Sequence, residues 1–134
     1  MCGVVLCASS NYISILAKNV TGKTYIDKKH GYLTGTLQGS HCGVPGYDCP
    51  RITVGANTDN VVSRIRAYES VYRTSTGKYI DGANTDWCSN KASCGIDVDL
   101  EHKYVGVKTT TYGTVDAIQE KAYAVHLTMQ YTDK

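Results

Sequence analysis

Residues 123–131 read YAVHLTMQY and alternate without a break between apolar and polar side chains. Successive side chains of a β-strand point to opposite faces of a sheet, so this alternation predicts a strand with one buried and one exposed face. Residues 96–100, IDVDL, repeat the pattern with carboxylates as the polar members. Both segments are therefore predicted to be half-buried strands.

The composition also favours a sheet. The chain holds 15 Thr, 13 Val and 11 Tyr but no Phe, and branched and aromatic side chains pack well on a pleated surface. Its 134 residues suit one domain, residues 1–134, with a sizeable core. Many short strands joined by glycine-containing turns predict an all-β fold, an antiparallel sandwich or barrel. Further strands are expected at residues 2–6, 12–17, 23–27, 32–37, 51–54 and 104–112, with one short helix within residues 114–121.

Residues 60–73 are compatible with two structures. On a helix after Asp59 as N-cap, one face would carry an apolar stripe. On a strand, one face would carry Val61, Ile65, Ala67 and Val71. The β-branched residues and the Ser-Thr-Gly turn at 75–77, which leads into Lys-Tyr-Ile, favour a long hairpin strand. The members of the helical stripe would be Val61, Val62, Ile65, Tyr68 and Tyr72.

Six cysteines in so short a chain predict three disulfides formed in an oxidising compartment, and hence secretion. Residues 2–6 are too few for the apolar core of a signal peptide, so we expect a mature form with Met1 added for expression. Between Cys88 and Cys94 lies a polar loop that can fold back, so these two cysteines are expected to pair. No C-x-x-C motif occurs, which argues against zinc.

The other four cysteines are expected to form crossed bridges. Residues 3–6 favour a strand, which would hold Cys2 and Cys7 ~16 Å apart, beyond the reach of a disulfide. An odd separation also places the two on opposite faces of that strand. We therefore expect each to pair with Cys42 or Cys49, so that two bridges tie the N-terminal strand to the 42–49 loop.

The sequence GANTD occurs at residues 55–59 and again at 82–86, and both copies are expected to be turns. The second copy leads into Trp87, the only tryptophan. An indole offers a flat apolar surface, and Asn and Asp side chains orient hydroxyl groups. Asn84, Asp86 and Trp87 are therefore the predicted binding site for a saccharide or another polar partner. Tyr47, in the glycine- and proline-containing 42–49 loop, is the second candidate.

The charges indicate neither a nucleic-acid partner nor a defined metal site. The formal net charge is +2, and basic and acidic residues are interspersed. Asp97, Asp99 and Glu101 share one strand face and could bind calcium. Lysines on a neighbouring strand would equally relieve the repulsion between these carboxylates. The candidate lysines are Lys103, Lys108 and Lys121.

An enzyme is the weakest of the function classes considered. A ribonuclease could use His126, Glu69 and either Arg64 or Arg66, because phosphodiester transfer needs a base, an acid and a cation. No known ribonuclease motif, nucleophile elbow or P-loop accompanies them. We therefore assign no catalytic residue, metal or cofactor.

The sequence thus predicts a secreted, disulfide-stabilised β domain that binds a protein or a glycan, as a small effector, toxin or lectin does. An alternative is a structural subunit of an extracellular filament, assembled by adding a strand such as residues 123–131 to an open sheet edge. No apolar run approaches the ~20 residues of a membrane-spanning helix.

Overall fold

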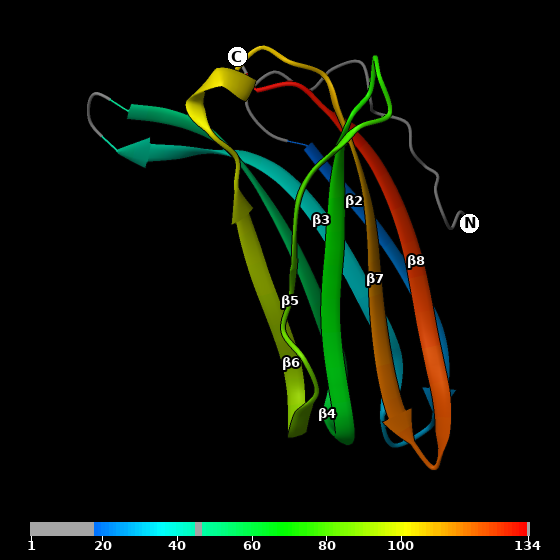
Figure 1. Cartoon of the computed structure of the whole chain (residues 1–134). Helices are drawn as coiled ribbons and strands as arrows, with labels where there is room; N and C mark the ends of the chain where they lie inside the picture. Colours follow the sequence, from blue (N-terminus) through cyan, green and yellow to red (C-terminus); the bar gives the residue numbers. More distant parts are fainter. Residues whose placement is uncertain (1–17, 45–46, 134) are drawn as a thin grey trace.

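The computed structural model of the chain describes residues 18–44 and 47–133, and it consists almost entirely of β-strands (Figure 1). The strands expected at residues 2–6 and 12–17, together with Cys2 and Cys7, lie outside the described residues. The elements are β2 (Lys18–Asp27), β3 (Gly31–Val44), β4 (Tyr47–Arg73), β5 (Tyr79–Asn84), β6 (Cys88–Asp99), the 3-10 helix η1 (His102–Tyr104), β7 (Thr109–Gln119) and β8 (Lys121–Tyr131).

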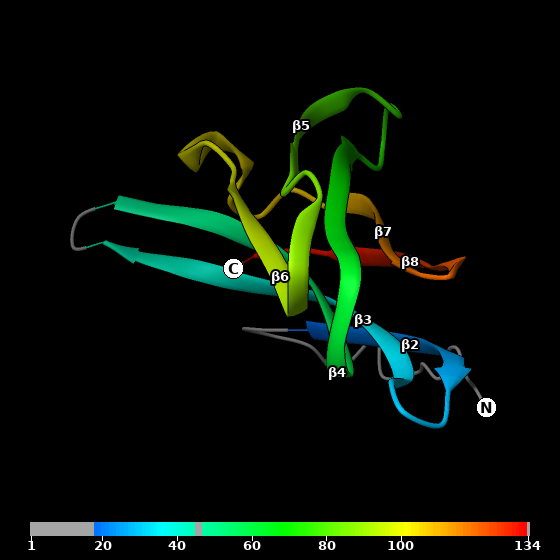
Figure 2. The same cartoon turned by 90° about the horizontal axis from the view of Figure 1, so that it is seen from below.

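All seven strands belong to one antiparallel sheet with the main order β2-β3-β4-β7-β8. The 27-residue strand β4 organises this sheet, because its first part pairs with β3 and β6 and its second part pairs with β7 and β5. The sheet curls until β2 contacts β8 (Figure 1), which gives a nearly closed barrel. The far end of the β3–β4 hairpin projects away from the barrel in both views (Figures 1 and 2). The predicted all-β antiparallel fold, expected to be a sandwich or a barrel, is confirmed and takes the form of a barrel.

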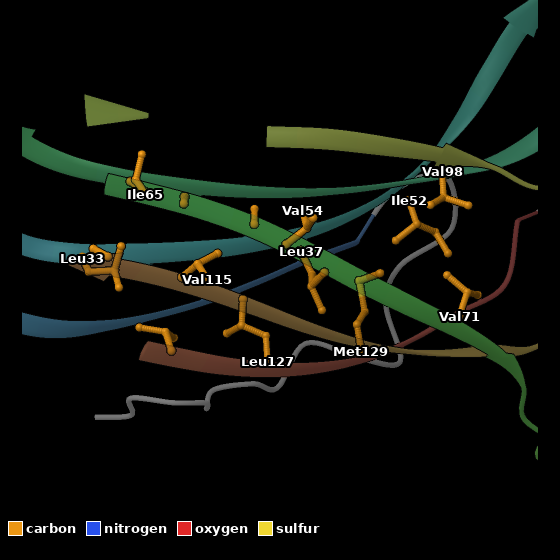
Figure 3. Close-up of a cluster of buried hydrophobic side chains, with 14 of the residues drawn as sticks. Leu33, Leu37, Ile52, Val54, Ile65, Val71, Val98, Val115, Leu127 and Met129 are labelled. Atoms are coloured by element: carbon orange, nitrogen blue, oxygen red, sulfur yellow. The ribbon is translucent and has the colours of Figure 1, made fainter. Parts of the chain in front are cut away.

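Aliphatic side chains from six strands fill the barrel interior (Figure 3). Two glycines allow large side chains to pack there. A Cβ atom on Gly39 would lie 2.4 Å from the ring of Tyr131, and one on Gly113 would lie 2.6 Å from Leu37. The largest fully buried apolar side chains are Leu33, Leu37, Ile52, Val54, Val62, Ile65, Val71, Leu100, Val115 and Met129.

The ambiguous residues 60–73 form a strand, as expected, within β4. Ile65, Ala67 and Val71 face the core, but Val61 is 55% exposed while Val62 is buried. The inward-facing positions of β4 are even-numbered up to Val62 and odd-numbered from Ile65 onwards, with Ser63 and Arg64 both exposed between them, so Val61 lies before this change of face. The prediction that Val61 shares a face with Ile65 was therefore wrong. The alternation of apolar residues does not show where a strand changes the side that faces the core.

Three local predictions are corrected by the pairing. Residues 104–108 form no strand, because η1 and a turn at Gly106, with φ +82°, lead the chain past Asp133 before β7 begins. No helix forms at residues 114–121, since β7 continues to Gln119 between β4 and β8 and turns back at Glu120. Neither GANTD copy is wholly a turn: residues 55–57 pair with both β3 and β6 inside β4, and residues 82–84 belong to β5 and pair with β4, which leaves only residues 85–86 outside a strand.

Two disulfides are present among the described cysteines. Cys88 bonds to Cys94, which confirms that prediction. Cys42 bonds to Cys49, so the expected crossed bridges to Cys2 and Cys7 are wrong. The reason is that the 42–49 segment extends the β3–β4 hairpin, which places Cys42 directly opposite Cys49 with 5.2 Å between their Cα atoms.

The three-residue η1 is the only helix within residues 18–44 and 47–133, and no helix there is long and apolar enough to cross a membrane.

Candidate functional site

The outward face of the β5–β4–β7–β8 part of the sheet carries an unusual concentration of aromatic side chains. Along β4, the core-facing residues between Ile65 and Val71 alternate with outward-facing ones. The outward residues of β4 are Arg64, Arg66, Tyr68, Ser70 and Tyr72. Pairing places Thr114 of β7 beside Tyr68, and Asn84 of β5 on its other side. Residues distant in sequence therefore meet on one exposed surface, which we call the aromatic face.

Arg66 is at the centre of the first depression on this face. Its guanidinium carbon lies 4.3 Å from the ring centroid of Trp87 and 5.1 Å from that of Tyr68. Its Nε donates a hydrogen bond of 2.8 Å to Asp116, the neighbouring residue on β7. The indole of Trp87 thus packs against a cation that a carboxylate holds in place.

This depression has a volume of about 250 Å³ and combines polar and apolar walls. Arg66, Asp116 and Trp87 contribute the charged and aromatic groups. The apolar groups come from neighbouring positions at the β7–β8 turn, Ile118, Ala122 and Ala124. We call this the Arg66 recess.

Several polar atoms of the Arg66 recess are available to a ligand. Within the described part of the chain, the indole N–H of Trp87, the terminal nitrogens of Arg66 and the Oδ1 atom of Asp116 have no hydrogen-bond partner. Trp87 is half-buried and the Asp116 side chain is 16% exposed. The recess therefore offers donors and an acceptor beside an apolar surface, an arrangement typical of small polar ligands.

A second depression, of about 380 Å³, lies between Tyr68 and Tyr79. Gly82 and Asn84 of β5 and Ser70 of β4 line it. Gly82 is needed here, because a Cβ atom at this position would lie 2.8 Å from the Tyr79 hydroxyl and 2.7 Å from a backbone oxygen of Glu69. We call this depression the Tyr79 groove.

The predicted binding residues divide between these features. Trp87 lines the Arg66 recess and Asn84 lines the Tyr79 groove, so the structure brings both to one face. Asp86 is not among the described lining residues of either depression. Its backbone N–H donates a 2.8 Å hydrogen bond to Asn84 Oδ1, and its φ of +59° shapes the turn before Trp87. Tyr47 pairs with Val44 at the projecting hairpin, and its side chain lies outside what the structure describes. The length of strand β6, Cys88–Asp99, lies between Tyr47 and Trp87.

Arg66, Tyr68, Tyr79 and Asp116 line these depressions, but the sequence reasoning did not select them as binding candidates. The alternation RIRAYESVY at residues 64–72 could have shown that arginine and tyrosine share a face. No local pattern shows that Asp116 joins them, because 50 residues separate it from Arg66.

The proposed ribonuclease residues do not meet. Glu69 faces the core and is 2% exposed, and neither carboxylate oxygen has a hydrogen-bond partner among the described residues. Burial, with smaller contributions from Asp97 and Asp81, raises the pKa of Glu69 to about 8. His126 is on the opposite, exposed face of the sheet, where its Nδ1 lies 3.2 Å from the Thr114 hydroxyl.

The carboxylates of residues 97–101 are held by other side chains. Arg51 donates to both oxygens of Asp99, at 2.7 and 3.0 Å, and thereby lowers the pKa of that carboxyl. Asp97 accepts a 2.6 Å hydrogen bond from Thr53, and Lys103 lies 3.5 Å from Glu101. Arg51 therefore relieves most of the repulsion between these carboxylates, a role that we had expected of lysines. Within the described ranges, no three His, Cys, Asp or Glu side chains are arranged to hold a metal ion.

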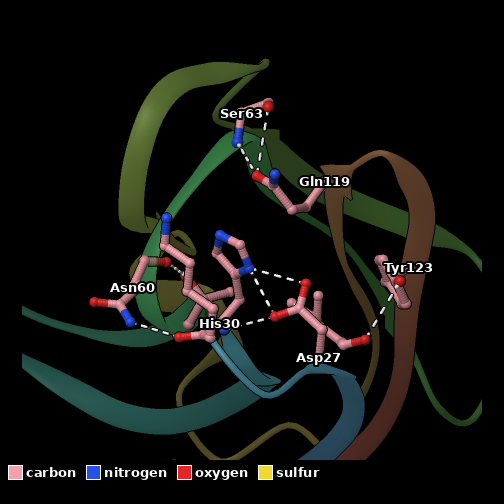
Figure 4. A network of polar contacts seen from close by, with 9 residues as sticks. Asp27, His30, Asn60, Ser63, Gln119 and Tyr123 are labelled. Atoms are coloured by element: carbon pink, nitrogen blue, oxygen red, sulfur yellow. Dashed lines mark hydrogen bonds and ion pairs between the residues drawn. The ribbon is translucent and has the colours of Figure 1, made fainter.

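A polar network ties the β2–β3 turn to the rest of the barrel (Figure 4). His30 is buried, and its Nδ1 lies 2.8 Å from Asp27. Gln119 accepts a hydrogen bond from the Ser63 backbone, and the Tyr123 hydroxyl donates to the Ile26 carbonyl. The Tyr123 hydroxyl thus connects β8, whose residue Tyr123 also lines the Arg66 recess, to β2.

The chain matches no known family model, no curated protein sequence and no solved structure.

Proposed function

We propose that this protein is a secreted, lectin-like domain that binds a glycan on its aromatic face, with the Arg66 recess as the principal subsite. The observation that carries the proposal is the grouping of a half-buried Trp87 with Arg66 and Asp116 around apolar side chains. The two short-range disulfides support secretion, because such bonds form and persist in oxidising compartments.

A sugar ring suits these groups chemically. Its C–H face packs on aromatic rings, while its hydroxyls need donors and acceptors of fixed orientation. Trp87 and Tyr68 supply the aromatic surface, and Arg66 is held between them by stacking and by its bond to Asp116. The polar groups are therefore ordered before a ligand arrives, which reduces the entropy lost on binding.

The mixed walls of the Arg66 recess favour an N-acetylated sugar. The methyl of an acetamido group would pack on Ile118, Ala122 and Ala124. Its carbonyl would accept from an Arg66 terminal nitrogen, and its N–H would donate to Asp116 Oδ1. A free amine in place of the acetamido group would lose the apolar contact and bring a positive charge towards Arg66.

Isothermal titration calorimetry with N,N′-diacetylchitobiose tests the proposal, and the deacetylated glucosamine disaccharide serves as the comparison ligand. We expect the acetylated disaccharide to bind at least about tenfold more tightly, a difference of about 1.4 kcal/mol. Trp87→Ala should abolish binding. Tyr25→Ala, which removes an exposed tyrosine of β2, should leave it unchanged.

Two outcomes contradict the proposal: wild-type protein that binds neither disaccharide, or equal losses in Trp87→Ala and Tyr25→Ala. Circular dichroism of Trp87→Ala distinguishes loss of a ligand contact from loss of the fold.

A further inference from the structure

We infer that the aromatic face binds an extended oligosaccharide rather than a single terminal sugar, with the chain running from the Arg66 recess across Tyr68 into the Tyr79 groove. This inference rests on the proposed function, since it assigns additional sugar subsites to the same face.

The two depressions adjoin along β4. Arg66 lines the first depression, while Tyr68 and Ser70 line the second. Alternate residues of a strand are ~6.6 Å apart, so the outward positions from Arg66 to Tyr72 span ~20 Å. One sugar ring occupies only part of that length, and several linked rings are needed to cover it.

Tyrosines continue the face beyond Tyr68. The ring centroid of Tyr72 lies 5.6 Å from that of Tyr79 and 5.7 Å from that of Tyr112, both in edge-to-face geometry. This packing holds the rings in place although Tyr79 and Tyr112 are 59% and 54% exposed. A cluster of ordered, exposed aromatic rings next to a depression is typical of a binding surface.

Apart from Glu69, the polar residues that line the groove beside these tyrosines carry neutral donors and acceptors. Asn84 uses Oδ1 within its own turn, and its Nδ2 has no partner in the described part of the chain. Ser70 is half-buried at the same groove. Both can bond sugar hydroxyls.

The groove lacks the charge needed for a nucleic acid. None of its described lining residues is Lys or Arg, whereas a strand of DNA or RNA requires cations along its phosphate backbone. The aromatic rings therefore favour the C–H faces of a neutral saccharide over stacked bases.

Titration with β-1,4-linked N-acetylglucosamine oligomers of increasing length, from the disaccharide to the hexasaccharide, tests this inference. We expect the affinity of the wild-type protein to rise about tenfold or more over that series. Tyr79→Ala combined with Tyr112→Ala should remove this gain in affinity with length. Tyr25→Ala combined with Tyr32→Ala, which truncates two exposed tyrosines on β2 and β3, is the matched control and should keep the gain.

Equal affinity of the wild-type protein for all lengths, with binding that still depends on Trp87, would overturn the extended site and leave the proposed function standing. Absence of binding at every length would overturn both. Tighter binding of oligo(dT) than of the hexasaccharide, lost in the Tyr79 and Tyr112 double variant, would assign the face to a nucleic acid.

Discussion

The Nδ1 atom of His41 lies 2.8 Å from the carboxylate of Asp133, whose side chain is fully buried. The Nε2 atom of the same ring lies 3.0 Å from Asp48, so one imidazole bridges two acids. This bridge connects the β3–β4 hairpin to the C-terminal segment, and both carboxylates raise the pKa of His41.

The bridge makes part of the stability depend on pH. Because the pKa of His41 is raised in the folded state, its contribution is fully present below the unfolded value of about 6.5 and is lost as pH rises through the folded value. We expect His41→Gln to lower the melting temperature more at pH 5.5 than at pH 9. An equal effect at both pH values in thermal denaturation would contradict this assignment.

Glu69 gives a second, larger pH dependence. Its folded pKa of about 8 exceeds the value of 4.5 for a free carboxyl, so the folded protein retains a proton that the unfolded chain releases. Stability should therefore fall between about pH 4.5 and 8, by at most ~1.4 kcal/mol per pH unit. Glu69→Gln should reduce this slope and stabilise the protein at pH 8.5. Urea denaturation of both proteins at pH 5 and 8.5 measures the change, and parallel slopes would disprove it.

Trp87 fluorescence reports on the Arg66 recess. A half-buried indole should emit at longer wavelength than a core tryptophan and be quenched by acrylamide. The Arg66 guanidinium lies over the Trp87 ring, so the Arg66→Ala variant should be quenched more strongly. Arg64→Ala, an exposed arginine on the same strand face, is the control and should have no effect. An unquenchable, blue-shifted emission would eliminate Trp87 as a binding residue.

The two described disulfides predict a defined peptide map. Proteolysis under non-reducing conditions should yield peptides that join Cys42 to Cys49 and Cys88 to Cys94. Each bond closes a short loop, so replacing either pair by serine should cost about 2 kcal/mol of stability. The 88–94 variant should also weaken glycan binding, because Trp87 directly precedes that loop. Recovery of peptides that link Cys2 or Cys7 to the 42–49 loop would contradict this pairing and support the crossed bridges instead.

Gly39 and Gly43 form a matched pair on β3. A Cβ atom on Gly39 would meet the buried ring of Tyr131 at 2.4 Å, whereas one on Gly43 would meet nothing within 4 Å. Gly39→Ala should destabilise the protein by about 1–3 kcal/mol through overpacking. Gly43→Ala should change stability little. Similar unfolding midpoints for the two variants would show that the barrel can move Tyr131 aside.

Local sequence was enough for most of the strands, and residue chemistry singled out two residues of the aromatic face. The alternation in residues 123–131 predicted β8, because the two-residue period of a strand depends only on its own backbone. Trp87 and Asn84 were predicted to bind a ligand on the basis of residue chemistry; the structure places both on the aromatic face, and their binding role stays a prediction.

Only the tertiary structure decided which strands pair and in which register. Arg66 meets Asp116 because β4 bonds to β7, and Cys42 meets Cys49 because β3 continues as a hairpin with β4. Val61 faces solvent because the side of β4 that faces the core changes between Val62 and Ile65. Alternation specifies which residues of one strand share a face, whereas packing of the whole core selects the neighbouring strand and its register.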